Sequence, residues 1–449
     1  MKKSITVDIT DVEYPNISVA RLEDGKKIKI KNGILGQKVE IKKSKKNKGK
    51  IINIIEHSKL ENSKIYCPNE KTCGGCSYQR VPYETELLIK LKMIKNLFKS
   101  NEINFDKISI TQSPKITEYR DKMEYTFGDE EKGGILQLGL HKKNKFYEIG
   151  DTEECNIVDE DFEMIRKFVL EYFRRKNTKH FHKIKHDGLL RSLIVRKALN
   201  TGEIMVNLVT TSNEEFDLQS KNDFARVLKG ANVKGKIVSI IHTINDSISD
   251  AVIAEKIELL YGKNYITEEM MGLKFKISPF SFFQPNVYTA EKLYKKALEF
   301  ASINKQTKVL DLYSGTGTIT QIMAKEAKEA TGIELVEEAV EMAKENAKIN
   351  NIKNINFICG DVLEKIDDLK NKFDVIVLDP PREGIHPKAI NKIIEFNPEK
   401  FVYISCNPKT QVRDMKIFLE KGYELLKYEA IDQFPKTRHV ETIALMSRK

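Results

Sequence analysis

The stretch VLDLYSGTGT, residues 309–318, decides the fold class of this 449-residue chain. Its apolar half predicts a buried strand, and the Gly-x-Gly that follows predicts a tight turn that opens a helix. Glycines at such a turn let the backbone approach a ligand at the carboxyl end of the strand. The third glycine of the dinucleotide-binding fingerprint is missing, so the turn predicts a ligand crevice without naming the ligand.

Apolar strands alternate with amphipathic helices from about residue 285 onward. The predicted strands are VLDL, ATGIEL, NINFICGD, FDVIVLDPP and FVYISCNP, followed by a late pair, YELLKYEAI and ETIALMS. This alternation is typical of a doubly wound, Rossmann-like α/β sheet. We therefore predict an α/β domain of that kind over residues 271–449.

Acidic residues stand at the ends of three successive strands of this domain. Glu334 closes the strand after Asp311, at a place where a carboxylate can hold a ribose diol. Asp361 closes the third strand, where a carboxylate can reach an adenine amine. Three such acids favour S-adenosylmethionine over a nicotinamide as the ligand; the alternative is that they only cap helices.

The fourth strand ends in Asp379-Pro-Pro-Arg382, and the two prolines predict a rigid turn beside the crevice. Methyltransferases that act on exocyclic base amines carry an aromatic residue after the prolines, to stack the base. Arg382 stands there in this chain. The motif therefore argues against base-amine methylation and leaves methylation of a ring carbon open.

Cys406 ends the fifth strand, at the edge of the sheet where such folds place their chemistry. Its polar and turn-forming neighbours favour a thiol that faces a cavity and acts as a nucleophile. The alternative is a buried structural cysteine. Cys359, inside the apolar run NINFICGD, is by contrast predicted to lie in the core.

Methylation of a pyrimidine ring carbon explains why a thiol is needed. C5 of uracil is a poor nucleophile, and addition of a thiolate at C6 gives C5 the carbanion character that takes a methyl group from a sulfonium. A base must then remove the C5 proton before the thiol leaves. Glu441 and His439, both in FPKTRHVE, are candidates, and the residues alone do not choose between them.

The remaining cysteines follow the spacing C-x5-C-x2-C, with the last one 79 positions further on. Gly74 and Gly75 let this loop wrap tightly around a metal centre. Four thiolates fit either a tetrahedral zinc ion or a [4Fe–4S] cluster, and the spacing leaves that choice open. The alternative is a set of unrelated free thiols: Cys67, Cys73, Cys76 and Cys155.

The net charge of +11 is concentrated near the N-terminus, because residues 26–50 hold eleven lysines and one acid, Glu40. Five short predicted strands with glycine turns indicate a small oligonucleotide-binding (OB)-like barrel over residues 1–57. A lysine-rich barrel favours a nucleic-acid partner over a merely solvated face. Residues 58–270 read as strand runs with few helices, which predicts a central α+β domain carrying the cysteine loop.

The composition, 40% hydrophobic and 31% charged residues, excludes a disordered or collagen-like chain. No apolar stretch reaches the roughly 18 residues that a membrane span requires, so we expect no membrane partner. Few cysteines in so long a chain favour a reduced, cytoplasmic setting over a disulfide scaffold. We expect no obligate protein partner.

Together these motifs closely resemble the RNA uracil-5-methyltransferase family, specifically the branch that methylates 23S ribosomal RNA. An N-terminal TRAM domain resembles residues 1–57, and CPNEKTCGGCSYQ resembles the iron–sulfur loop of the family. SPFSFFQPN is similar to the entry into its class I methyltransferase domain. YRDK, residues 119–122, resembles an FRNK-type motif near the RNA but departs from it at two positions. The resemblance implies a [4Fe–4S] cluster, rather than zinc, on Cys67, Cys73, Cys76 and Cys155.

The resemblance also implies the roles of the site residues. Cys406 would be the nucleophile and Glu441 the base that removes the proton. S-adenosylmethionine would be bound by Gln284, Tyr313, Glu334 and Asp379. The expected reaction converts a uridine of 23S ribosomal RNA to 5-methyluridine, with the T-loop uridine of transfer RNA as the alternative substrate.

Overall fold

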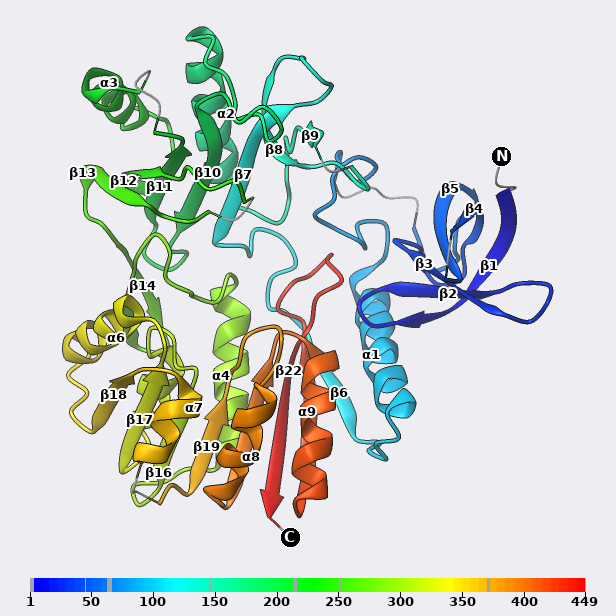
Figure 1. The fold of residues 1–449 in the computed structure, drawn as a ribbon, viewed down its shortest axis with the longest axis vertical. Coiled ribbons are helices and arrows are strands. Elements are labelled where there is room, and N and C mark those ends of the chain that lie inside the picture. Colours follow the sequence, from blue (N-terminus) through cyan, green and yellow to red (C-terminus); the bar gives the residue numbers. More distant parts are fainter. Residues whose placement is uncertain are drawn as a thin grey trace. The chain divides into compact units, whose positions relative to one another are not determined.

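The computed structural model describes residues 4–44, 46–62, 67–145, 147–212, 216–249, 252–369 and 372–448 (Figure 1). The chain divides into two compact units. Unit 1 consists of Met1–Ile65, Ser77–Pro114 and Tyr288–Lys449, and unit 2 of Tyr66–Cys76 and Lys115–Val287.

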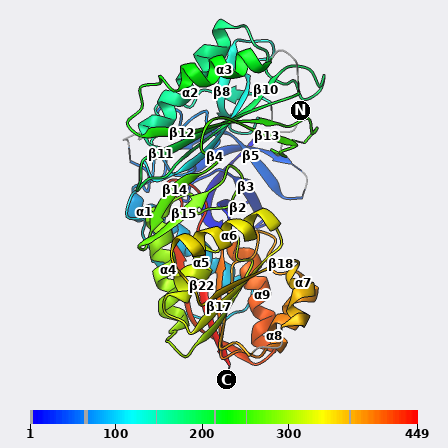
Figure 2. The same ribbon diagram turned by 90° about the vertical axis from the view of Figure 1, so that its left-hand side faces the viewer.

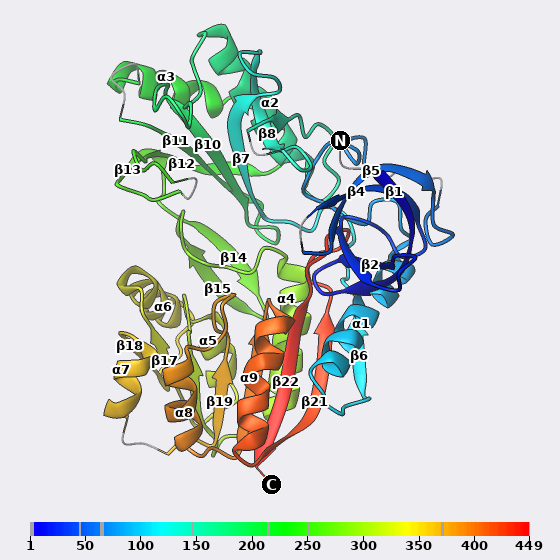
Figure 3. The same ribbon diagram turned by 45° about the vertical axis from the view of Figure 1, so that its right-hand side comes forward.

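The N-terminal strands of unit 1 close into a barrel in the order β1-β2-β3-β5-β4 (Figure 3). Lysines and isoleucines alternate along β3, with the isoleucines buried and the lysines exposed, because successive side chains of a strand point to opposite faces. Val39 and Ile41 pack into the same core from β4. The predicted barrel is confirmed. Its strands are β1 (Ser4–Glu13), β2 (Ile17–Arg21), β3 (Lys27–Lys31), β4 (Lys38–Ser44) and β5 (Lys48–Glu56).

Unit 1 also contains the predicted Rossmann-like sheet, in the strand order β18-β17-β16-β19-β20-β22-β21-β6. Neighbouring strands from β18 to β20 are parallel, and β22 runs antiparallel to both β20 and β21. The strands are β16 (Lys308–Leu312), β17 (Glu329–Glu334), β18 (Ile355–Cys359), β19 (Val375–Leu378), β20 (Lys400–Ser405), β21 (Tyr423–Ile431) and β22 (Glu441–Arg448).

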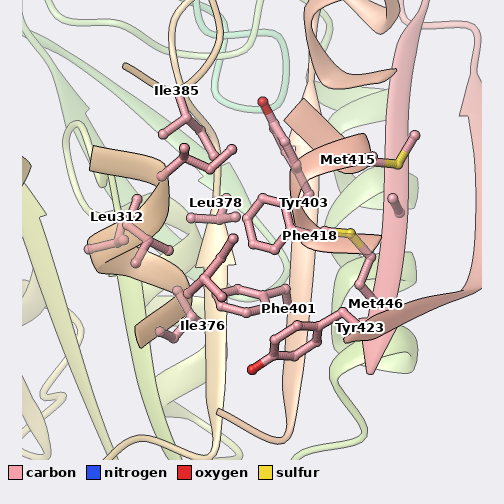
Figure 4. Close-up of a cluster of buried hydrophobic side chains, with 14 of the residues drawn as sticks. Leu312, Ile376, Leu378, Ile385, Phe401, Tyr403, Met415, Phe418, Tyr423 and Met446 are labelled. Atoms are coloured by element: carbon pink, nitrogen blue, oxygen red, sulfur yellow. The ribbon is translucent and has the colours of Figure 1, made fainter. Parts of the chain in front are cut away.

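Helices cover both faces of this sheet, with α4 and α5 on one face and α7, α8 and α9 on the other (Figure 2). The core between the sheet and the layer of α7, α8 and α9 includes Leu378 of β19, Tyr403 of β20 and Phe418 of α9 (Figure 4). Burying strands on both faces explains their near-continuous apolar runs. The helices are α4 (Val287–Ala301), α5 (Thr318–Ala324), α6 (Glu337–Ile349), α7 (Val362–Lys365), α8 (Pro387–Glu395) and α9 (Pro408–Glu420).

Two elements from the predicted central range pack in unit 1 instead. The strand β6 (Ile108–Thr111) pairs in parallel with β21, and the helix α1 (Tyr83–Ser100) packs against β1, β6 and α9. At the other boundary, unit 2 extends to Val287. The compact units thus partition the chain differently from the ranges 1–57, 58–270 and 271–449, because strand pairing joins segments that are far apart in sequence.

Unit 2 is built on a sheet in the order β13-β12-β11-β10-β7-β8-β9, with a separate β14-β15 hairpin. Its helices are α2 (Glu160–Arg175) and α3 (Leu218–Leu228). The strands are β7 (Lys122–Asp129), β8 (Leu136–His141), β9 (Ile149–Gly150), β10 (Leu190–Lys197), β11 (Glu203–Thr210), β12 (Lys236–Ile244), β13 (Lys256–Gly262), β14 (Ile266–Met270) and β15 (Leu273–Ile277). In the described part of the chain, no helix is both long and apolar enough to cross a membrane.

Candidate active site

The candidate site lies where the parallel strands of unit 1 end. Strands β16 to β20 share one direction, so their carboxyl ends meet at one edge of the sheet. The strand order reverses between β16 and β19, which is the place where open α/β sheets bind ligands. The predicted residues at this edge are Tyr313, Glu334, Asp361, Asp379 and Cys406.

The glycine turn after β16 is shaped for close approach. Gly315 and Gly317 have φ values of 53° and 74°, in the left-handed region that favours glycine. A Cβ on Gly317 would lie 2.6 Å from the ring of Phe357, whereas a Cβ on Gly315 would meet nothing within 4 Å. Tyr313 also has a positive φ, 69°, which a side-chain-bearing residue adopts only under constraint. The open space at Gly315 fits a ligand against the backbone.

Glu334 organises this turn from the neighbouring strand. Its carboxylate accepts the backbone N–H of Gly315 at 2.9 Å and that of Val336 at 3.0 Å. Asp361 accepts the N–H of Leu363 at 2.7 Å and so caps α7, as the helix-cap alternative expects. Glu334 therefore connects the glycine turn after β16 with the turn after its own strand, β17.

Asp311 has a different role from the one that its position in the sequence suggests. It is fully buried within β16, and its Oδ2 accepts the hydroxyl of Thr320 in α5 at 2.5 Å. Burial raises the pKa of its carboxyl to about 7, and within the described residues its Oδ1 has no hydrogen-bond partner. It ties the helix to the strand rather than lining the crevice.

Strand pairing brings Cys406 and Glu441 together, although they are 35 positions apart. In the antiparallel β20–β22 pair, Ser405 lies opposite Thr442. Cys406 follows the one residue and Glu441 precedes the other, so both stand at the same edge. The Thr442 hydroxyl donates to the carbonyl oxygen of Ser405 at 3.1 Å and fixes this register.

Burial dominates the electrostatics of the pair. Burial, which has the largest effect, and the neighbouring carboxyls of Glu441 and Asp379 together raise the pKa of the Cys406 thiol to about 12, against the lowering effect of Arg382. Burial also raises the pKa of Glu441 to about 8, with Asp379 adding to the shift and Arg382 opposing it. The pKa of Asp379 is raised by burial to about 7. These groups lie within one another's electrostatic reach.

Arg382 is fixed by the turn that follows Cys406. Its carbonyl oxygen accepts the side-chain amide of Asn407 at 2.8 Å and the Thr410 hydroxyl at 3.2 Å. Its Nη2 lies 3.3 Å from Nδ1 of His439, the second candidate base. His439 is therefore engaged with the arginine, whereas Glu441 interacts electrostatically with the thiol.

Tyr14 is a site residue that sequence reasoning missed. It lies in the turn between β1 and β2 of the barrel, and its hydroxyl is 3.5 Å from the carbonyl oxygen of Cys406. Burial and the charges of Glu441 and Cys406 raise the pKa of its phenol. No periodicity or motif pointed to this residue, because the contact joins positions 392 apart.

Comparison with known proteins decides the family. Residues 82–449 match the model of the family described as tRNA (uracil-5-)-methyltransferase. The chain belongs to this family. It is an RNA (uracil-5-)-methyltransferase that uses S-adenosylmethionine, and the open glycine turn with its acidic neighbours fits that methyl donor.

Relatives of this methyltransferase cover the whole chain. An uncharacterized RNA methyltransferase of Clostridium tetani is 48% identical over 100% of this chain and 98% of its own. One of Caldanaerobacter subterraneus is 46% identical over 99% and 98%. A crystal structure of Pyrococcus abyssi tRNA (uracil-54, C5)-methyltransferase, in complex with S-adenosyl-L-homocysteine, superposes with a TM-score of 0.77. It is 26% identical and covers 98% of this chain and 100% of that one.

Unit 2 of the methyltransferase carries the other predicted site residues. Gln284, in the segment after β15, is buried. In the YRDK motif, burial and, to a smaller extent, the charge of nearby Arg196 together lower the pKa of Lys122 to about 8. The motif therefore holds cationic groups in a partly desolvated environment.

Cys67, Cys73 and Cys76 of the loop and the more distant Cys155 all lie in unit 2, and none forms a disulfide bond within the described residues. Burial, which has the largest effect, and the thiols of Cys67 and Cys73 together raise the pKa of Cys155 to about 11, so these three interact. The N–H of Gly74 donates to the carbonyl oxygen of His141 at 3.1 Å, which ties the loop to β8. Across the described ranges, no group of three or more His, Cys, Asp or Glu side chains has an arrangement that could hold a metal ion.

The prediction that Cys359 lies in the core is wrong. Its side chain is exposed at the end of β18, with Sγ 3.8 Å from the carbonyl oxygen of Leu335. β18 is the outermost strand of the sheet at that side, so an apolar run there is only partly covered.

Proposed function

We propose that this methyltransferase converts a uridine in structured RNA to 5-methyluridine, with Cys406 as the nucleophile and Glu441 as the base. The observation that carries the proposal is the β20–β22 register, which sets Ser405 opposite Thr442 and so brings the thiol and the carboxyl to one edge. The electrostatic coupling of Cys406 to Glu441 supports the same pairing.

The proposed reaction begins when the Cys406 thiol gives its proton to solvent and its sulfur forms a bond to C6 of uracil, while the C5=C6 electron pair shifts to C5 and O4. S-adenosylmethionine supplies the electrophilic methyl group: its sulfur–methyl bond breaks as the methyl group bonds to C5, and S-adenosylhomocysteine leaves. Glu441 then takes the C5 proton, and the electron pair left behind re-forms the C5–C6 double bond as the C6–S bond breaks. The target base must leave its stack to reach the thiol. Arg382, which lowers the pKa of both groups, would stabilise their charged forms.

Four residues are proposed to bind S-adenosylmethionine: Gln284, Tyr313, Glu334 and Asp379. The strained backbone at Tyr313 and the two amide hydrogen bonds of Glu334 support a preformed pocket around the glycine turn. Equilibrium dialysis with labelled S-adenosylmethionine tests this set, since Glu334→Gln should weaken binding. Unchanged affinity would remove Glu334 from it.

The proposed substrate is 23S ribosomal RNA. The exposed barrel lysines supply a cationic surface for a polyanion, and they include Lys26, Lys27, Lys29, Lys31, Lys42, Lys43, Lys46, Lys48 and Lys50. The second candidate is the T-loop uridine of transfer RNA, because the similar Pyrococcus abyssi enzyme is a tRNA (uracil-54, C5)-methyltransferase. We propose that the reaction takes place in the cytoplasm.

A [4Fe–4S] cluster on Cys67, Cys73, Cys76 and Cys155 is part of the proposal. The effect of Cys67 and Cys73 on the pKa of Cys155 supports it. In the described residues the thiols are not arranged as metal ligands, so the assignment is tested by measuring iron directly. Protein purified without oxygen should contain iron and show a broad absorption band that extends into the visible range. Zinc in place of iron, or no metal, would overturn the cluster assignment without touching the methylation proposal.

The central experiment measures methyl transfer to purified 23S ribosomal RNA and to transfer RNA transcripts. Wild-type protein should form 5-methyluridine in one of them, and mapping the modified position identifies the substrate. Cys406→Ala should abolish product formation. A variant without the thiol that still makes 5-methyluridine would show that the proposed mechanism is wrong.

A further inference from the structure

The loop between β21 and β22, residues 432–440, is largely buried, with only Arg438 exposed. We call it the base loop, because it leads directly into Glu441. Asp432, Gln433 and Val440 have no exposed surface, and Lys436 is only 3% exposed. Loops usually run over the surface, because a buried loop leaves backbone polar groups without water. The groups that replace water therefore decide where this loop, and with it Glu441, comes to lie.

The helix α1 and the residues just before it supply those groups. The Nζ of Lys90 donates to the carbonyl oxygen of Phe434 at 3.2 Å. The backbone N–H of Lys436 donates to Oε1 of Glu86 at 2.7 Å, and the Nζ of Lys436 donates to the carbonyl oxygen of Val81 at 2.8 Å. In Figure 1 the base loop is the red segment above β22, and α1 is drawn beside it.

The segment immediately before α1 also binds Lys436, through its backbone carbonyl oxygen. The backbone N–H groups of Ser77 and Tyr78 both donate to the carbonyl oxygen of Lys436, at 2.8 and 3.0 Å. Lys436 has a φ of 66°, in the left-handed region. A residue with a side chain keeps that conformation only when its surroundings hold it there. Glu86 on one side and these two amides on the other do so.

A fully buried ion network anchors this arrangement. Lys90 lies between two carboxylates, with its Nζ 2.7 Å from Glu86 and 2.6 Å from Asp432, and none of the three side chains is exposed. Burial lowers the pKa of Lys90, but Asp432 and Glu86 raise it by more, so the amine is charged. Buried charges are costly unless they are paired, so removing one partner strands the others. The network therefore has one favourable arrangement, which fixes the start of the base loop.

The C-terminal end of the base loop lies in the candidate active site. His439 contacts Arg382, and Arg382 lowers the pKa of both Cys406 and Glu441. The position of the loop thus sets the proton-removing group and its neighbouring cation together.

We propose that Lys90, with its partners Glu86 and Asp432, is a positioning residue that holds the base loop so that Glu441 can remove the C5 proton. None of the three touches the reacting atoms. This inference rests on the proposed function. It names the residues that make removal of the C5 proton by Glu441 efficient.

The test is Lys90→Met, which keeps the aliphatic stem and removes the charge. A displaced base slows only the step that it performs, so the covalent adduct between Cys406 and RNA should form and then decay roughly 10- to 100-fold more slowly. It should accumulate on a denaturing gel, while kcat and KM for RNA fall together and kcat/KM stays close to wild type, because an accumulating bound intermediate lowers KM. A residue that only stabilises the fold would reduce the active fraction and leave the decay rate of the adduct unchanged, and that outcome would overturn the inference.

Two further variants make the outcome readable. Lys95→Met makes the same change on an exposed position of the same helix, and its adduct should decay like that of the wild type. Glu441→Gln sets the reference, since it should trap the adduct completely. If Glu441→Gln traps no adduct, the proposed function fails. If it traps adduct and Lys90→Met does not, only the positioning inference fails.

Lys90→Met leaves buried Asp432 without its cation and Glu86 with only the Lys436 amine, 3.6 Å away, and so risks unfolding. The variant Glu86→Gln/Lys90→Met/Asp432→Asn removes these three charges together, which buried networks tolerate better than loss of one partner, and the remaining Lys436 amine keeps the carbonyl oxygen of Val81 as its acceptor. We expect it to melt as cooperatively as the wild type and still to accumulate adduct. A well-folded triple variant that resolves the adduct at the wild-type rate would also overturn the inference.

Discussion

Glu441 is a carboxyl that burial keeps protonated at neutral pH. Its side chain is 3% exposed, and its pKa is raised to about 8. A base must be deprotonated to act, so the rate at which the covalent adduct decays should rise with pH and level off above about 8. Single-turnover decay of the adduct from pH 6 to 9.5 at constant ionic strength checks this. A profile that is flat across this range would contradict the assignment of Glu441 as the base.

The same pKa predicts how stability depends on pH. A carboxyl whose pKa is higher in the folded state binds its proton more tightly there, so its contribution is present below about pH 4.5 and is lost as the pH rises through about 8. Glu441→Gln stays neutral, so its stability relative to wild type should increase across that window by roughly 2–4 kcal/mol. Denaturant unfolding at pH 5 and pH 9 measures the difference. Equal differences at both pH values would show that Glu441 is ionised in the fold.

Among the elements, the β1–β2 turn contributes Tyr14 to the candidate site. The ring packs against the core of the sheet, whereas the hydroxyl makes one long contact of 3.5 Å. Tyr14→Phe keeps the ring and should stay within about threefold of wild-type kcat, since one weak hydrogen bond contributes little.

Tyr14→Ala, in contrast, removes the ring beside Cys406 and should lower kcat by roughly tenfold and stability by about 3 kcal/mol. KM for RNA should change little in either variant. Steady-state kinetics with both, alongside thermal melts, separate the two contributions. If Tyr14→Phe were as impaired as Tyr14→Ala, the hydroxyl and not the ring would be what the site uses.

α1 connects the barrel with the base loop. Asn96 donates to Asp11 and to the carbonyl oxygen of Val12 at 2.9 and 2.8 Å, and the sulfur of Met93 accepts the N–H of Asn16 at 3.1 Å. The same helix carries Lys90 on its buried side. One helix therefore orders both the turn that holds Tyr14 and the loop that holds Glu441.

At the scale of the whole molecule, the charge is a local property of the barrel. Eleven of the lysines lie in residues 26–50, and the lysines of β3 alternate outward from a buried isoleucine face. Replacing Lys42, Lys43 and Lys48 by glutamine should weaken RNA binding. It should also reduce the slope of log K against log salt by about 2–3, since each phosphate contact contributes about 0.7–0.9.

A matched variant carries the same three changes on exposed lysines of α4 and α6, namely Lys295, Lys344 and Lys348. Its salt slope should equal that of the wild type. Filter binding over a range of salt concentrations compares the two. If both variants, or neither, lose slope, the barrel is not the main electrostatic contact with RNA.

Local patterns carried most of the fold prediction. The alternation in KIKIK and the strand–turn–helix of VLDLYSGTGT each specify an element from a few adjacent residues, because side-chain periodicity and backbone preference are local. Both elements are present where they were expected. The placement of α1 and β6 was not predictable in this way, since it depends on the pairing of β6 with a strand 320 positions later.

In the candidate site, too, some features follow from local sequence and others from contacts between distant residues. From the residues came the proposed nucleophile, Cys406, and the glycine turn, because chemistry is a property of residue type, while the choice of Glu441 over His439 as the proposed base came from the family resemblance. The groups that surround them depend on tertiary packing. Lys90 and Asp432 are 342 positions apart, and Tyr14 and Cys406 are 392 apart. Burial and the resulting pKa values arise from such contacts, and no local pattern encodes a contact whose energy depends on excluding water from both partners.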